Sequence, residues 1–171
     1  METDKQHAFL KQLKRLVDDT KGRNNRGNRA ALRRYWSPAT RYQAYPILGQ
    51  LGALTDDRKA ILAALYAEQP EHQEGQTVGK AAMKLGDRKD GNHPYDHHFR
   101  RLLACDSLKD LAQQLHRLAK RLQREGIGLD YAALHKNLNC WANWSKDVKY
   151  KWAADFWQSP MPPTNQEGTE I

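Results

Sequence analysis

The chain has 171 residues, an apolar share of 39% and a formal net charge of +8 at pH 7. This apolar share, with leucines and tryptophans spread along the whole length, predicts a folded core rather than a disordered polyelectrolyte. The last fourteen residues contain two glutamates and no lysine or arginine, so residues 1–157 carry an even larger positive excess. A basic balance of this size indicates association with nucleic acid or another anionic surface.

Nothing in the sequence predicts export or membrane insertion. The first residues, METDKQHAFLKQL, are polar and acidic at the start, unlike a secretory signal. No stretch approaches the roughly 18 uninterrupted apolar residues that a membrane span requires. The two cysteines, Cys105 and Cys140, lie in segments of apolar periodicity, which favours buried thiols in a reducing compartment over a disulfide. We therefore expect a cytoplasmic protein with no membrane partner.

The first part of the chain predicts a series of helices. Apolar residues at helical spacing predict a helix over about residues 4–18. After a loop rich in Gly and Asn, Asn28 is the predicted cap of a short helix over 29–36, which a Ser-Pro pair ends. Thr55 is the predicted cap of the next strong helix, over 56–69. A weaker helix is predicted between the helix over 29–36 and this one.

The polar stretch QPEHQEGQ, residues 69–76, is the predicted boundary between two lobes. Beyond it, helices are predicted up to about Leu85, from Pro94, over 107–125 and in two separate segments after residue 130. In chain order, the predicted signals for these later helices are a start at Thr77, a cap at Asp106 or Ser107, a stop at Gly126, a cap at Asp130 and a start at Ser145.

No segment shows the alternation typical of a strand, and no internal repeat is present. The predicted fold class is therefore all-α, with two small helical bundles packed together and no sheet. The predicted organisation is an N-terminal helical lobe over 1–68, a C-terminal helical bundle over 77–157 and a disordered tail over 158–171.

The stretch KGRNNRGNRAALRRYW, residues 21–36, has six cationic side chains and no carboxylate. It lies in a wider acid-free segment between Asp19 and Asp56. The positive charge must therefore meet water, carboxylates from other parts of the chain, or an external polyanion. The cations of the acid-free segment are Lys21, Arg23, Arg26, Arg29, Arg33, Arg34 and Arg41.

Basic residues fall on helix faces opposite the apolar ones when positions are sorted at about 100° per residue. In the helix over 107–125, leucines form one stripe and four cations form a ridge roughly 10 Å long on the other side. Arg29 and Arg33 share a face of their helix, and Arg26 joins them if that helix begins early. The candidate nucleic-acid-binding residues are Arg26, Arg29, Arg33, Arg34, Arg100, Arg101, Arg117, Lys120, Arg121, Arg124, Lys146 and Lys149.

Aromatic residues beside these cations could stack nucleic acid bases. Helical periodicity favours core packing for Trp141 and Trp152. Trp36 and Trp144 lie near predicted helix ends beside cations, and they are the weaker stacking candidates.

Catalytic chemistry is not indicated. In the letters HPYDHH, His93 and His97 have the i,i+4 spacing of metal ligands with Asp96 between them, but Pro94 implies a helix start that leaves His93 at its edge. There is no Cys-x-x-Cys pair for zinc, no phosphate-binding Gly-rich loop and no Gly-x-Ser-x-Gly elbow. We predict no enzymatic activity, no metal and no cofactor.

Four stretches together resemble one known family: NRAALRRYWSP, TVGKAAMKLG, FRRLLACDSLKDLAQQLHRLAKRLQREGIGLDYAALHKNLNCW and KYKWAADFW. In this order they resemble CasB, the small subunit of the type I-E CRISPR Cascade surveillance complex. The resemblance covers about residues 5–157. Neither the loop over 22–28 nor the tail over 158–171 has a counterpart in it.

The resemblance implies a non-enzymatic, all-helical protein of two bundles. The family is present as a homodimer within Cascade, where it contacts the backbone and large subunits. It steadies the hybrid of guide RNA and target DNA and holds the displaced non-target strand in a basic groove. The positions that match basic family positions are Arg33, Arg34, Arg58, Arg101, Arg117, Lys120, Lys146 and Lys149. The last basic group is all lysine here, which forms weaker phosphate contacts than arginine.

Three alternatives stay open. The chain could be a free-standing helical regulator that binds DNA or RNA by itself. It could be a metal-dependent nuclease that uses His93, Asp96 and His97. It could also be a structural adaptor whose charges only keep it in solution.

Overall fold

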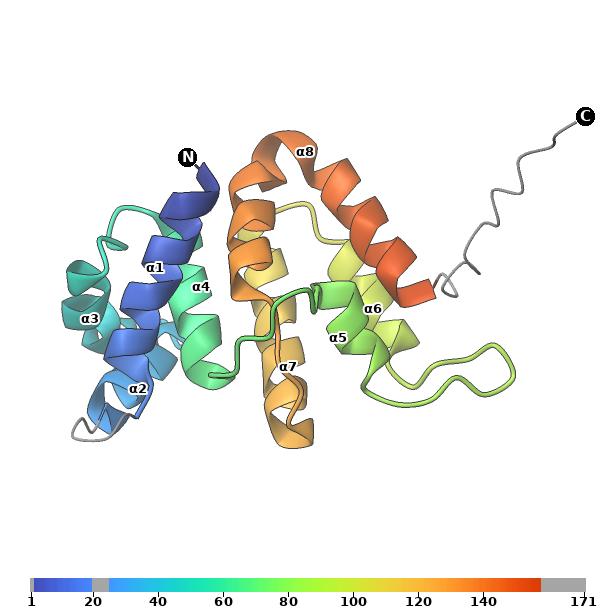
Figure 1. Ribbon diagram of the computed structural model, residues 1–171, viewed down its shortest axis with the longest axis horizontal. Coiled ribbons are helices and arrows are strands. Elements are labelled where there is room, and N and C mark those ends of the chain that lie inside the picture. The colour runs from blue at the N-terminus through green and yellow to red at the C-terminus, as the bar shows by residue number, and fades with distance from the viewer. Residues whose placement is uncertain (1, 20–24, 158–171) are drawn as a thin grey trace, which may run out of the picture.

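The computed structural model describes residues 2–19 and 25–157, and Figure 1 shows that these residues form helices joined by loops. The helices are α1 (Glu2–Val17), α2 (Arg26–Arg33), η1 (Arg34–Trp36), η2 (Arg41–Ala44), α3 (Tyr45–Gln50), α4 (Asp57–Glu68), α5 (Val78–Met83), α6 (Asp96–Leu103), α7 (Leu108–Glu125) and α8 (Tyr131–Trp157). The described residues contain two isolated β-bridges and no strand. The predicted all-α class is confirmed. The predicted tail over 158–171, and Lys21 and Arg23, lie outside the described residues.

In the described part of the chain, no helix combines the length and the apolar character that crossing a bilayer would need.

Helices α1 to α4 gather at one side of the molecule and α5 to α8 at the other, and α4 and α7 adjoin between them (Figure 1). One apolar core runs through both sides. It includes Leu13 of α1, Leu62 of α4, Leu115 of α7 and Trp152 of α8, each no more than 2% exposed. The division into lobes over 1–68 and 77–157 stays a prediction.

Hydrogen bonds join the segment predicted as a polar break, 69–76, to the loop after α7. Gln69 Nε2 donates to the Ile127 carbonyl at 2.6 Å, and Gln76 Nε2 donates to the Gly128 carbonyl at 2.7 Å. The backbone N–H of Gly75 donates to the Asp130 carboxylate at 2.8 Å. These bonds satisfy buried amides, so this connection is an ordered part of the fold.

Most predicted caps of the later helices are confirmed. The Thr77 hydroxyl accepts from the Lys80 N–H, and the Ser107 hydroxyl accepts from the Asp110 N–H. The Asp130 carboxylate accepts from the Ala133 N–H at 2.9 Å. Gly126 ends α7 at φ +67°, a left-handed conformation that suits glycine.

Two predicted caps are wrong. Asp56, not Thr55, caps α4, and its carboxylate accepts from the N–H groups of Arg58 and Lys59. Asn28 lies inside α2 and its Nδ2 donates to the Leu16 carbonyl at 3.0 Å. The helix begins earlier because Asn25, which precedes it, is itself held by the carbonyls of two residues at the end of α1 and just beyond it. At α4 the neighbouring residue Asp56, of the same capping type as Thr55, takes the position, whereas Asn25 precedes α2 without a side-chain capping hydrogen bond.

The two last predicted helices form one helix, α8, and Ser145 lies within it. The helix bends near its middle, so its two arms run in different directions (Figure 1). Buried apolar residues continue across the predicted break, from Trp141 at 3% exposed to Val148 at 8%. Packing of both arms on the core therefore overrides the local cap signal.

Candidate nucleic-acid interface

Helix α7 separates its apolar and cationic residues as predicted. Leu111, Leu115, Leu118 and Leu122 are buried, and Leu108 is half-buried. The four cations of the opposite face, Arg117, Lys120, Arg121 and Arg124, are exposed. The burial of the leucine stripe therefore fixes the direction in which the cations project.

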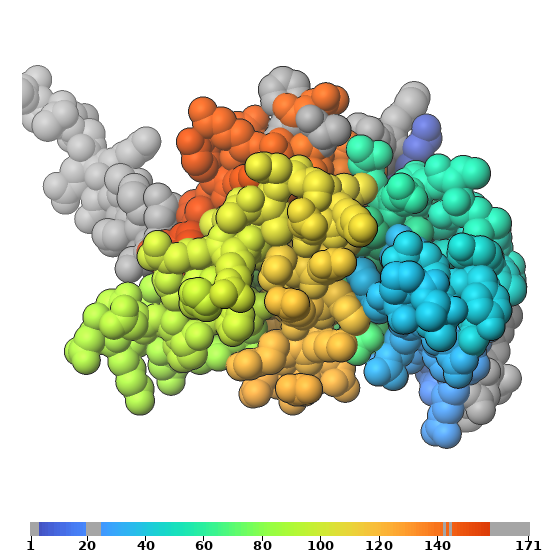
Figure 2. Space-filling model, turned by 180° about the vertical axis from the view of Figure 1, so that it is seen from behind, coloured from blue at the N-terminus to red at the C-terminus, as the bar shows by residue number. Residues whose placement is uncertain are grey.

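Helix α6 adds Arg101, also exposed, to the same region. We call Arg101, Arg117, Lys120, Arg121 and Arg124 the α6–α7 cationic surface. Figure 2 shows α6 and α7, yellow-green to orange-yellow, side by side at the centre of one face. Within residues 2–19 and 25–157, none of the five forms an ion pair with a carboxylate.

Electrostatic effects on two neighbouring side chains indicate that cations from both helices converge. Desolvation is the largest cause that lowers the pKa of His98, and electrostatic interactions with nearby basic groups lower it further. These groups are His97, Arg101, Arg121 and Arg117. Burial raises the pKa of Tyr95 to about 12, and the charges of Arg121 and Arg117 oppose this rise. A bound phosphate would relieve the repulsion at this point.

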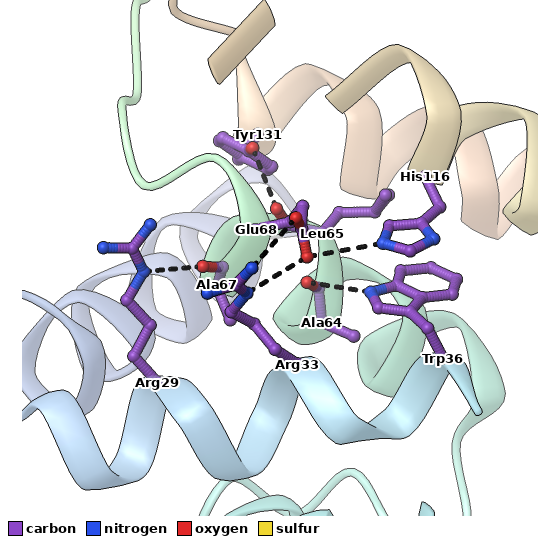
Figure 3. A network of polar contacts seen from close by, with 9 residues as sticks. All are labelled: Arg29, Arg33, Trp36, Ala64, Leu65, Ala67, Glu68, His116 and Tyr131. Atoms are coloured by element: carbon purple, nitrogen blue, oxygen red, sulfur yellow. Dashed lines mark hydrogen bonds and ion pairs between the residues drawn. The ribbon is translucent and has the colours of Figure 1, made fainter. Parts of the chain in front are cut away.

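Arg29 and Arg33 share a helix face as predicted, and that face lies against the end of α4 (Figure 3). Arg29 Nε donates to the Ala67 carbonyl at 2.8 Å. Arg33 Nε lies 3.2 Å from Glu68 Oε2, and 52% of the Arg33 side chain is exposed. The acid-free segment thus meets a carboxylate from α4, and nucleic acid binding by these two arginines stays a prediction.

Glu68 joins three elements through one carboxylate. Besides Arg33 of α2, its Oε2 lies 3.3 Å from His116 Nε2 of α7 (Figure 3). The hydrogen bond from His116, and after it the charge and hydrogen bond of Arg33, lower the pKa of Glu68 to about 2 against the opposing effect of burial. The His116 ring stacks on Trp36 with centroids 4.1 Å apart.

Sequence reasoning missed Glu68 and His116. A signal was present, because Glu68 is an acidic residue in the last turn of a helix, where the helix dipole disfavours negative charge. Such a residue is stabilised when cations reach it from elsewhere. Trp36 was a stacking candidate, but its ring is covered by His116 and its Nε1 donates to the Ala64 carbonyl at 3.3 Å. The Trp144 side chain lies outside the described part.

Three further candidates from the N-terminal half have partners within the chain. Arg58 Nε donates to the Leu138 carbonyl of α8 at 2.9 Å, and Arg34 donates to Gln43 Oε1. Arg26 Nε lies 3.8 Å from Asp19 Oδ2, with 83% of the arginine side chain exposed. Arg58 therefore joins the two sides of the molecule, while Arg26 and Arg34 stay at the surface.

The remaining candidates lie on α6 and α8. Arg100 pairs with Asp96 at 2.5 Å and packs over the Trp157 ring. Lys149 pairs with Asp106 at 3.1 Å and is only 21% exposed. Lys146 is exposed, and its Nζ lies 5.5 Å from the centre of the Tyr150 ring. Among the described residues, the exposed candidates without a carboxylate partner are the five of the α6–α7 cationic surface together with Arg34 and Lys146.

Two of the three side chains considered for metal binding, His93 and Asp96, have structural partners. His93 Nε2 lies 2.9 Å from the Met83 carbonyl, and its Nδ1 accepts from the Tyr95 N–H at 3.0 Å. Asp96 accepts from Trp157 Nε1 at 2.8 Å. In the part of the chain that the structure describes, no three His, Cys, Asp or Glu side chains are placed to hold a metal ion.

A profile of the CRISPR-associated protein Cse2 family matches residues 28–157. The chain belongs to this family. The match extends from within α2 to the end of α8 and therefore includes all of the α6–α7 cationic surface. A comparison with curated protein sequences gave no match.

Solved structures of Cse2 and CasB proteins have the same fold. CasB from Thermus thermophilus is 24% identical with a TM-score of 0.70, over 90% of this chain and 98% of that chain. A CRISPR-associated protein of the Cse2 family, also from Thermus thermophilus, is 25% identical, with the same TM-score and coverage. A chain of a CRISPR RNA-guided surveillance complex is 19% identical with a TM-score of 0.68, over 91% of this chain and 92% of that chain.

Proposed function

We propose that this protein is a non-catalytic, nucleic-acid-binding subunit of a type I-E CRISPR Cascade surveillance complex. In this role it stabilises the hybrid of guide RNA and target DNA and holds the displaced non-target strand. Its protein partners are the backbone and large subunits and a second copy of itself. The observation that carries the proposal is the combination of Cse2 family membership with the exposed α6–α7 cationic surface, whose cations form no ion pair among the described residues.

The chemistry of the α6–α7 cationic surface suits a sugar-phosphate backbone. Arginine guanidinium groups donate paired hydrogen bonds to phosphate oxygens, and such contacts position a strand without reading its sequence. In RNA-guided complexes, base pairing between guide and target supplies the sequence recognition. The protein therefore needs a backbone-binding surface and no base-reading helix.

Counterion release gives this binding a measurable signature. Each phosphate neutralised contributes a slope of about −0.9 on duplex DNA, or about −0.7 on a single strand, to log affinity against log salt. Arg117 and Arg121 lie one turn apart on α7 and act on the same neighbours, Tyr95 and His98. They are the residues expected to contribute most directly to this slope.

The test is the double charge reversal Arg117→Glu with Arg121→Glu in the assembled complex and in the purified chain. We expect weaker retention of nucleic acid and a flatter salt dependence. The matched control is Lys11→Glu with Arg15→Glu, an i,i+4 pair of exposed cations on α1, which changes the net charge equally. Equal binding by both folded variants and the wild type would contradict the proposal.

Co-purification separates a Cascade subunit from a free-standing regulator. A subunit is retained by its native partners, and nucleic acid is extracted from the assembly. A regulator binds duplex tightly as the isolated chain. Recovery of the chain alone, with tight duplex binding, would favour the regulator.

A further inference from the structure

Two tyrosines that lie close together on the N-terminal side are exposed, as is Tyr150 of α8. Tyr42 of η2 is 61% exposed and Tyr45 at the start of α3 is 47% exposed. In contrast, Trp141, Trp152 and Phe99 are no more than 3% exposed. A large aromatic side chain left in water twice within one short segment points to a surface that is covered by a ligand or partner.

The 3-10 geometry of the backbone places the two side chains on the same side of the chain. Tyr45 follows Tyr42 by three residues, and its N–H donates to the Tyr42 carbonyl in the 3-10 pattern. Residues three apart in a 3-10 helix are eclipsed, so the side chains project one above the other. Leu54, 55% exposed, continues this patch, because its side chain lies over Gly49, one turn after Tyr45 in α3.

Two arginines, Arg34 and Arg41, lie close to the segment that holds this tyrosine pair. The Tyr42 hydroxyl accepts from Gln43 Nε2 at 3.4 Å, and the amide oxygen of Gln43 accepts from Arg34. Arg41 packs over the neighbouring Tyr35 ring at 4.6 Å. All five residues belong to the acid-free segment, and Asp57, at the start of α4, is the carboxylate that acts on Tyr35.

We propose that Tyr42 and Tyr45 form a base-stacking platform for single-stranded nucleic acid. This inference rests on the proposed function. It adds a second region of contact with nucleic acid, separate from the α6–α7 cationic surface. Aromatic rings beside cations bind single strands because every base offers a flat π face, whereas the bases of a duplex are already stacked. Among the described residues, neither Arg34 nor Arg41 forms an ion pair with a carboxylate, so these two cations favour a polyanion over a protein partner at this place. Figure 2 shows η2 and α3, in cyan, on the same face as α7.

The test is Tyr42→Ala with Tyr45→Ala in the full chain, measured with two probes. One probe is a thymine-rich single strand, and the other is a strand of equal length without bases. We expect about tenfold or greater loss of affinity for the strand with bases, and no change for the abasic strand. The slope of log affinity against log salt stays unchanged, because stacking neutralises no phosphate.

Two matched variants complete the experiment. Tyr42→Phe with Tyr45→Phe keeps both rings and retains the affinity, and Leu54→Ala removes apolar surface without a ring and also retains it. Equal losses on both strands, or no loss on either, would overturn the stacking platform. The tyrosine-to-alanine and Leu54→Ala variants could instead bind the strand with unchanged affinity but lose a subunit from the complex. This result would assign the patch to a protein partner. A wild-type chain and complex that bind no single strand would overturn the proposed function as well.

Discussion

The imidazole of His116 stacks on the indole of Trp36, with ring centroids 4.1 Å apart and an interplanar angle of 9°. Trp36 ends η1 and His116 lies in the middle of α7, so the stack joins segments eighty residues apart. Because His116 also reaches Glu68, the stack continues into the Arg33 ion pair. The aromatic residue that the sequence offered for nucleic acid thus stabilises the fold.

Replacement of Trp36 by alanine is expected to lower the free energy of unfolding by about 2 kcal/mol, less than for a fully buried tryptophan because Trp36 is half-buried. The Ala64 carbonyl also loses its donor. Denaturant titration measures the change. Trp36→Phe keeps a flat ring for His116 and should recover most of the loss, and neither variant should alter the salt slope of nucleic acid binding.

Glu68 is expected to make stability depend on acid. Its folded pKa of about 2 lies below the ordinary value of 4.5, so its contribution is present above about pH 4.5 and is lost as pH falls toward 2. The shift corresponds to stabilisation on the order of 3 kcal/mol. We expect Glu68→Gln to be less stable than the wild type at pH 7, and the difference to shrink between about pH 5 and pH 2.5.

Denaturant titrations of both proteins across this range check the prediction. Below its folded pKa the wild-type carboxyl is itself neutral, so the two stabilities approach each other. A stability difference that does not vary with pH would show that Glu68 acts through packing and not through its charge.

Gly79 allows α5 to pack closely on α8. A Cβ atom at this position would lie 2.3 Å from the Trp152 carbonyl oxygen and 2.7 Å from Asp155 Cβ. Gly79→Ala should therefore lower the free energy of unfolding by about 3 kcal/mol, measured by thermal or denaturant unfolding.

Gly27 is the matched control, because it lies in α2 with nothing within 4 Å of an added Cβ. Gly27→Ala should leave stability unchanged or raise it by up to about 1 kcal/mol, since alanine favours the helix. Equal effects at the two glycines would contradict the close approach of α5 and α8.

Arg29→Met is expected to lower the free energy of unfolding by about 1–2 kcal/mol, because the Ala67 carbonyl at the end of α4 loses a charged donor. Methionine keeps an unbranched apolar stem, so packing changes little. The control Arg124→Met, on the exposed face of α7, should change stability by less than about 0.5 kcal/mol. Denaturant titration compares the two, and an equal loss at both positions would refute a structural role for Arg29.

Helical periodicity predicted much of this molecule. The α7 leucine stripe and its cationic face are local properties, since side chains three and four residues apart must share a side of one helix. The caps at Thr77, Ser107 and Gly126 are local as well, because each satisfies backbone groups within a few residues. Thr55 failed because an equally suitable residue stood beside it.

The arginine partners could not be predicted in this way. Arg29 meets the Ala67 carbonyl 38 residues away, and Arg33 meets Glu68 35 residues away. No spacing rule links such positions, because their proximity arises only when α2 packs on α4. For the same reason, the arginines of the acid-free segment and those of α7 were equally good candidates in the sequence. In the structure, several arginines of the acid-free segment are bound within the fold. The cations of the α6–α7 cationic surface are exposed and form no ion pairs among the described residues.

The helical class, the excess of positive charge and the face of each helix that must be buried follow from the amino-acid sequence, because composition is read directly from it and helix propensity and the 3.6-residue period involve only near neighbours. The packing of the helices determines which cations are bound by carbonyls and carboxylates within the protein and which remain exposed. A cation pairs with groups that lie close to it in space, whatever their separation along the chain. The same packing left Tyr42 and Tyr45 exposed, while it stacked His116 on the half-buried ring of Trp36.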